Sequence, residues 1–103
     1  MFARINTELA TNISKLSDSV SLICYPNPFT EQVTIEIMIS DDQKVDARIL
    51  DIRGRLIRIL YRGNVTGKKT LVWDGNNEQG ARMAAGNYFV KANNSVQKIM
   101  LKR

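Results

Sequence analysis

The stretch Trp73-Asp74-Gly75-Asn76-Asn77-Glu78-Gln79-Gly80 connects two short apolar segments, Lys69–Trp73 and Asn87–Ala92. Three glycines and three amide side chains lie between these segments. Glycine adopts positive φ angles without steric cost, and asparagine tolerates them better than most residues do. The composition therefore predicts a shaped connection between two strands, with Trp73 and Tyr88 as bulky anchors at its ends. Taken alone, the stretch is most typical of an ordinary sandwich loop.

Further strands are predicted on both sides of this connection. The clearest is Val33–Ser40, in which Val and Ile alternate with other side chains, as in a half-buried strand. The pairs Leu56-Ile57 and Ile59-Leu60 interrupt such alternation, which predicts a β-bulge or cover on both faces. A loop is expected over Gly63–Gly67. The remaining predicted strands are Ser21–Tyr25, Val45–Ile52, Arg55–Tyr61 and Gln97–Lys102.

Seven strands at spacings of roughly 8–12 residues, without a convincing helix between them, are typical of an all-β domain. The predicted fold is a seven-stranded antiparallel sandwich of the immunoglobulin/fibronectin-III type. A chain of 103 residues is one domain's worth and can bury a core without metal or disulfides. The sandwich is assigned to residues 21–103.

Residues 1–20 have a different character. Ile5, Leu9, Ile13, Leu16 and Val20 recur at spacings of three or four, which allows a short amphipathic helix. The many Ser, Thr and Asn residues between them favour caps and turns instead. We therefore expect a linker or flexible arm, with a helical turn possible near residues 7–17. No apolar signal-peptide core follows Met1, so no N-terminal export signal is expected.

The net charge of +5 raises the question of a nucleic-acid partner. Acidic residues are absent after Glu78, and four arginines lie between Arg53 and Arg62. Solvated strand faces explain this pattern better than nucleic-acid binding does. The few aromatic residues sit among apolar neighbours and are not interleaved with basic residues, as a stacking platform requires. No nucleic-acid partner is expected.

The side chains needed for common enzymatic chemistry are missing. The chain has no histidine, which removes Ser–His and Cys–His pairs and the commonest zinc ligand. Cys24 is the single cysteine and is expected to be a buried, inert thiol. Asp74, Asn76 and Glu78 resemble the start of a calcium loop, but Gln79 and Ala85 occupy the positions of its essential Gly and Glu. We expect no enzyme, cofactor, metal or small-molecule substrate.

Short motifs follow one another in order from residue 25 onward. They are Tyr25-Pro26-Asn27-Pro28-Phe29, then Asp51-Ile52-Arg53-Gly54-Arg55, Trp73-Asp74-Gly75 with Gly80, Gly86-Asn87-Tyr88-Phe89, and Lys98-Ile99-Met100-Leu101-Lys102-Arg103. This ordered set resembles the type A C-terminal sorting domains of the type IX, or Por, secretion system of Bacteroidetes. A related pattern occurs in the immunoglobulin-like domain of flagellar hook-capping proteins and in modules of extracellular enzymes. A structural or adhesive module is therefore the alternative.

The resemblance implies that the domain belongs to a larger exported cargo protein. The cargo would pass through the periplasm, and outer-membrane translocon components would recognise the folded domain. A sortase-like cysteine protease would then typically cut near residues 12–24, leaving the cargo at the cell surface or outside the cell. The resemblance assigns recognition to Gly86, Tyr88, Lys98, Ile99, Met100, Leu101, Lys102 and Arg103.

The last strand is also interesting on physical grounds. If it lies at a sheet edge and ends at Arg103, its unpaired backbone groups could accept a partner strand. Lys98, Lys102 and Arg103 would attract an acidic receptor surface. From spacing alone, protection of the edge against aggregation is the better interpretation of these basic residues. The resemblance favours recognition.

Overall fold

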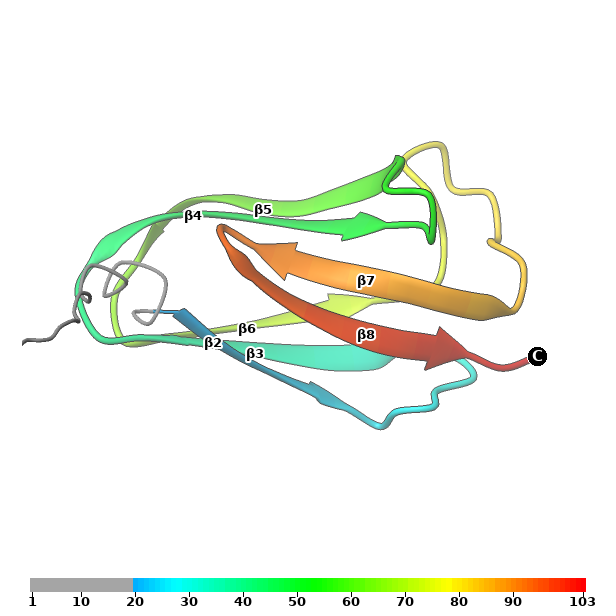
Figure 1. Cartoon of the computed structure of the whole chain (residues 1–103), viewed down its shortest axis with the longest axis horizontal. Coiled ribbons are helices and arrows are strands. Elements are labelled where there is room, and N and C mark those ends of the chain that lie inside the picture. The colour runs from blue at the N-terminus through cyan, green and yellow to red at the C-terminus, as the bar shows by residue number, and fades with distance from the viewer. Residues whose placement is uncertain (1–19) are drawn as a thin grey trace, which may run out of the picture.

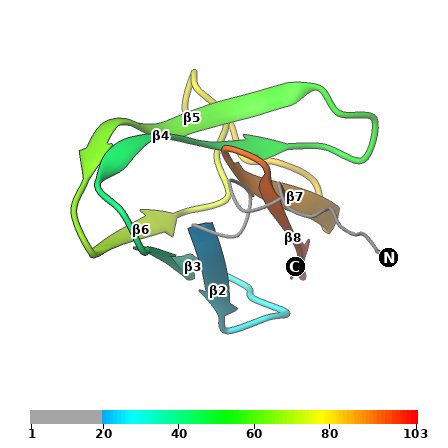
Figure 2. The same cartoon turned by 60° about the vertical axis from the view of Figure 1, so that its left-hand side comes forward.

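The computed structural model describes residues 20–103, which form two facing antiparallel sheets (Figures 1 and 2). One sheet has the strand order β2-β3-β6 and the other β5-β4-β7-β8. This arrangement confirms the predicted seven-stranded sandwich. No helix in the described part of the chain could span a membrane. The strands are β2 (Val20–Tyr25), β3 (Val33–Ile39), β4 (Gln43–Leu50), β5 (Leu56–Val65), β6 (Lys68–Trp73), β7 (Gly86–Ala92) and β8 (Ser95–Leu101).

The core forms where the alternating apolar side chains of the two sheets meet. Val33, Ile35 and Ile37 of β3 are each 0% exposed, as the alternation of this segment predicts. Cys24 of β2 packs against the core and is half-buried. Its burial raises the pKa of the thiol to about 11, so the unreactive protonated form dominates at neutral pH.

Two β-bulges confirm the irregularity predicted in β5. The register with β4 shifts between Ala47 and Arg48 and again between Ile49 and Leu50, which leaves Leu60 and Ile57 of β5 without a partner in β4. Both unpaired residues pack against the core. The bulges therefore let consecutive apolar side chains of β5 contribute to the core on one side of the strand.

Some predicted boundaries were wrong. The expected loop over Gly63–Gly67 begins too early, because β5 continues to Val65, which is 4% exposed and belongs to the core. β4 ends at Leu50 rather than near Ile52. Val20 belongs to β2, and the rest of the predicted arm lies outside the described residues. Residues 20–24 of the expected cleavage region are therefore part of a strand and not of a linker.

Candidate functional site

The motifs singled out in the sequence gather at one end of the sandwich. This end, here called the motif end, consists of residues 26–32, 51–55, 74–85 and 102–103. It lies at the right in Figure 1, around the C-terminus. The segments are far apart in the sequence, and the sandwich topology brings them together.

Three aromatic side chains form the floor of the motif end. The ring of Trp73 lies 5.7 Å from that of Phe29 and 5.3 Å from that of Tyr88, measured between centroids. The Trp73 indole N–H donates to the carbonyl oxygen of Asn76 at 2.8 Å, and the Tyr88 hydroxyl donates to the carbonyl oxygen of Ala84 at 2.6 Å. Trp73 and Tyr88, the two anchors predicted for the connection, thus bind its backbone through hydrogen bonds from their polar atoms.

The connection from residue 74 to 85 is shaped by its own side chains. Asp74 Oδ1 accepts from the backbone N–H of Asn76 at 3.0 Å. Asn77 Oδ1 accepts from two further backbone N–H groups, at 3.0 and 2.9 Å. Gly75 and Gly80 have φ angles of +84° and +86°, which confirms the predicted need for glycine in this connection.

The segment 51–55 is a tight turn built around one carboxylate. Asp51 Oδ1 accepts from the backbone N–H groups of Arg53 and Arg55, each at 2.9 Å, and Oδ2 accepts from Arg55 Nε at 2.8 Å. These contacts, with the Arg55 backbone N–H as the largest cause, hold the pKa of Asp51 below its usual value. Gly54 completes the turn with a φ of +83°.

The outer edge of β8 is closed by the segment Asn27–Phe29. The Asn27 side chain accepts from the backbone N–H of Met100 at 3.0 Å and donates to the carbonyl oxygen of Lys98 at 3.1 Å. Phe29 donates its N–H to Met100 O at 2.9 Å and accepts from Lys102 N at 2.8 Å. The expectation of unpaired backbone groups along the end of the last strand was therefore wrong. The sequence could not show that a segment 73 residues away pairs with it.

The opposite edge of the same sheet is closed by Glu78. Its backbone N–H donates to Ile57 O at 3.2 Å, and its carboxylate accepts from Ile59 N at 2.8 Å. The carboxylate that resembled a calcium ligand is thus used to cap the bulged strand β5. Within residues 20–103, no three His, Cys, Asp or Glu side chains gather as a metal site would require.

The residues to which the resemblance assigns recognition fall into two groups. Ile99, Leu101 and Tyr88 are at most 5% exposed and form part of the core. Lys98 and Met100 are exposed because alternate side chains of β8 point outward, and Lys102 and Arg103, which follow the strand, are exposed as well. Gly86 has a φ of +151°, in the range that favours glycine. Only the exposed group can contact a partner without unfolding of the domain.

A polar hollow of about 320 Å³ also opens at the motif end. Arg103 reaches across this end, where its Nη2 donates to the carbonyl oxygen of Met83 at 2.8 Å. Glu31 and Arg82 were not recognised as neighbours from the sequence, since they lie on different loops and belong to no motif. The hollow is lined by Thr30, Glu31, Asp74, Asn76, Arg82 and Arg103.

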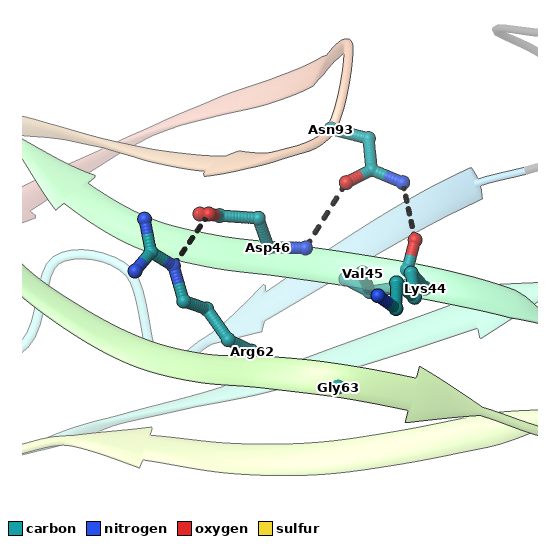
Figure 3. Close-up of a pocket in the computed structure, with 6 residues that line it drawn as sticks. All are labelled: Lys44, Val45, Asp46, Arg62, Gly63 and Asn93. Carbon is teal, nitrogen blue, oxygen red and sulfur yellow. Dashed lines mark hydrogen bonds and ion pairs between the residues drawn. The ribbon is translucent and has the colours of Figure 1, made fainter.

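A second hollow, of about 410 Å³, lies beside the hairpin between β7 and β8 (Figure 3). Here Asp46 accepts two bonds of 2.8 Å from Arg48 and one of 2.9 Å from Arg62. The hydrogen bonds from Arg48, followed by the one from Arg62, lower the pKa of Asp46 to about 2. Asn93 fixes β4 through bonds to Asp46 N and Lys44 O, at 3.0 and 3.1 Å. All these polar groups are used within the fold, so this cluster is structural.

The Asp46 cluster predicts a pH-dependent contribution to stability. The carboxylate titrates at about 2 in the folded chain and near 3.8 otherwise, so its stabilisation is complete above pH 4 and is lost as the pH falls toward 2. Because the side chain is 35% exposed, we expect at most about 1 kcal/mol. Urea unfolding of the wild type and Asp46→Asn should show a difference at pH 6 that disappears near pH 2. A difference that stays constant over this range would contradict the assignment.

The two sheets and their connections define a module of the immunoglobulin-like class. The chain belongs to the FlgD Ig-like domain family, whose family model matches residues 10–98. A FlgD Ig-like domain is a non-catalytic module. Among solved structures, the chain is similar to dimeric latent PorU from Porphyromonas gingivalis, with a TM-score of 0.65 and 22% identity. The match covers 80% of this chain and 9% of the PorU chain. No curated protein matches the sequence.

Proposed function

We propose that this domain is a sorting module that directs a larger cargo protein across the outer membrane through the type IX secretion system. The observation that carries the proposal is the gathering of the motifs at one end. Segments that resemble the sorting-domain signature, although dispersed from Tyr25 to Arg103, meet around the end of the last strand, with Phe29, Trp73 and Tyr88 buried beneath them. The chain is also similar in fold to PorU, and the name PorU contains the designation Por by which this secretion system is known.

The charge of this surface indicates the chemistry of its partner. Lys98 and Lys102 form no ion pair with any residue in 20–103, and Met100 between them is 41% exposed. Lys98 and Met100 project from the same face of β8, and Lys102 follows directly after the strand. A receptor surface with acidic side chains around an apolar contact would complement them. Such a receptor would be a component of the outer-membrane translocon.

Recognition through side chains fits the geometry better than addition of a strand. The bonds from Asn27 and Phe29 already occupy the outward backbone groups at the end of β8. A partner strand would first have to displace this segment and break four hydrogen bonds. The resemblance to sorting domains further implies that the domain passes through the periplasm in folded form and that a sortase-like cysteine protease removes it at the cell surface.

Membership of the FlgD Ig-like family supports a second candidate, a structural or adhesive module. Such a module should tolerate additional sequence after Arg103, whereas a sorting signal should not. A short hydrophilic extension after Arg103 therefore distinguishes the two functions in the same export assay.

The proposal is tested by fusing residues 12–103 behind a signal peptide and a fluorescent reporter in a Bacteroidetes host. Reporter should appear outside the cell only when the type IX translocon works. Reporter retained in the periplasm with and without the translocon, while the domain is folded, would favour the structural module.

Charge reversal tests the recognition surface within this assay. Lys98→Glu/Lys102→Glu should lower export by about tenfold, which corresponds to about 1.4 kcal/mol of lost recognition, while thermal stability stays unchanged. The control Lys44→Glu/Lys91→Glu makes the same charge change away from the motif end. Equal loss of export in both variants would show that net charge matters and that this surface does not.

A further inference from the structure

Each two-sheet sandwich has four edge strands, and here three of them are protected. Asn27 and Phe29 bond to residues 98–102 at the edge of β8, and Glu78 bonds to Ile57 and Ile59 at the edge of β5, as described above. β6 carries Lys68 and Lys69, and an edge lysine discourages the addition of another strand. Lys69 Nζ also lies 4.5 Å from the centroid of the Tyr61 ring in β5, so it spans the gap between the two sheets.

The fourth edge, β2, is covered at its first residue, where the Ser95 hydroxyl donates to Val20 O. Its sequence, VSLICY, contains no charge, proline or glycine. Ile23 and Tyr25 on its outer face are 47% and 45% exposed. An uncharged strand rich in β-branched and aromatic residues at an open edge is suited to pair with another strand.

The hydrogen-bonding groups on the open side of β2 follow from the register. Ile39 N donates to Gly67 O, which lies on the β6 side of β3. By alternation, Ile37 and Ile35 also direct their backbone groups toward β6. Their partners in β2 are Leu22 and Cys24, whose backbone groups must then point away from β3.

These backbone groups are free among the described residues. Val20 O is occupied, since the Ser95 hydroxyl donates to it at 2.7 Å. Leu22 and Cys24 have no bond on the open side to any residue in 20–103. The N–H and C=O groups of Leu22 and Cys24 therefore face outward, where another strand could bond to them.

We propose that β2 pairs antiparallel with β2 of a second copy of this chain, about a two-fold axis at Ile23. This register places Leu22 of each copy opposite Cys24 of the other, and all eight free groups form hydrogen bonds. Shifting the axis to Cys24 would place Leu22 opposite Pro26, which has no N–H to donate. The two three-stranded sheets join into one of six strands.

The register is the reason that a second copy is the occupant. The outward groups of Leu22 and Cys24 are arranged symmetrically about Ile23, so an antiparallel β2 of a second copy satisfies all of them. The chain carries +5, so two copies repel each other over most of their surfaces. β2 has no charged side chain, and the proposed axis brings Ile23 against Ile23. This edge is where two copies meet by apolar contact and backbone hydrogen bonds without opposing like charges. The proposal is independent of the sorting function.

The first test is sedimentation of the full chain over a concentration series. We expect a reversible dimer, and Ile23→Lys should weaken it by at least about tenfold because two lysines would face each other across the axis. Val72→Lys is the matched control. Val72 is 49% exposed on the same sheet face but lies on β6, two strands away. A monomer at every concentration up to about 1 mM, or equal weakening by both variants, would overturn the proposal.

Disulfide formation tests the register. Ile23 residues across the axis form a non-hydrogen-bonded pair with Cα atoms roughly 4.5 Å apart, a separation compatible with a disulfide. In a Cys24→Ala background, Ile23→Cys should cross-link into a covalent dimer when oxidised glutathione accepts the two electrons and protons. Val72→Cys in the same background should not. Cross-linking of both cysteines at one rate would indicate random collisions and contradict the pairing.

Discussion

Replacing Trp73 with alanine should lower the free energy of unfolding by about 4 kcal/mol. Trp73 is 0% exposed and lies between Phe29 and Tyr88, so its removal leaves a large cavity at the centre of the aromatic floor. The substitution also leaves the carbonyl oxygen of Asn76 without its donor. A loss of this size is a large part of the total stability of a domain, which is typically about 5–15 kcal/mol.

Urea denaturation followed by circular dichroism measures this loss. The matched control is Val72→Ala, which changes the adjacent residue of the same strand but removes a side chain that is 49% exposed. The control should be almost neutral. Comparable losses in the two variants would mean that Trp73 does not support the core in the described manner.

Leu101→Ala should cost about 3 kcal/mol of stability, because the side chain is 1% exposed and its methyl groups fill the core beneath the motif end. Lys102→Ala, one position further on, should leave stability unchanged, since that side chain is exposed. The alternation of β8 therefore predicts opposite outcomes at neighbouring positions.

This pair of variants separates folding from recognition in the C-terminal motif. Deletion of residues 98–103 removes two core side chains, Ile99 and Leu101, together with the exposed lysines, so loss of export after such a deletion has two possible causes. Thermal melting and export should be measured on the same proteins. If Leu101→Ala were as stable as the wild type, the assignment of Leu101 to the core would be wrong.

Local patterns in the sequence were sufficient to predict most of the fold. The alternation in Val33–Ser40 gave the central strand β3 and its buried face, because a half-buried strand needs this period and little else. The paired apolar residues at 56–57 and 59–60 indicated the bulges of β5. The glycines and amides after Trp73 indicated the shaped connection, since positive φ angles restrict the choice of residue.

The features that were missed depend on contacts between distant segments. Glu78 belongs to a loop in the sequence, and only the pairing of the sheets places its carboxylate beside Ile59 of β5. Asn27 likewise stands between two prolines that mark an exit from a strand, with no local sign that it binds β8. Gly63 resembled the start of a loop because the pairing with Val45 that keeps it in β5 is also not local.

The bonds between Asn27 and β8 also have a consequence for biosynthesis. Asn27 lies 73 residues before Met100, so it cannot form its bonds until β8 has been synthesised. Closure of the sandwich is therefore a late event in the folding of this domain. A chain that terminates before β8 would leave β7 with an unpaired edge and Asn27 without its bonds. A domain without β8 would therefore expose the edge of β7. Aggregation or proteolysis would then remove such incomplete chains.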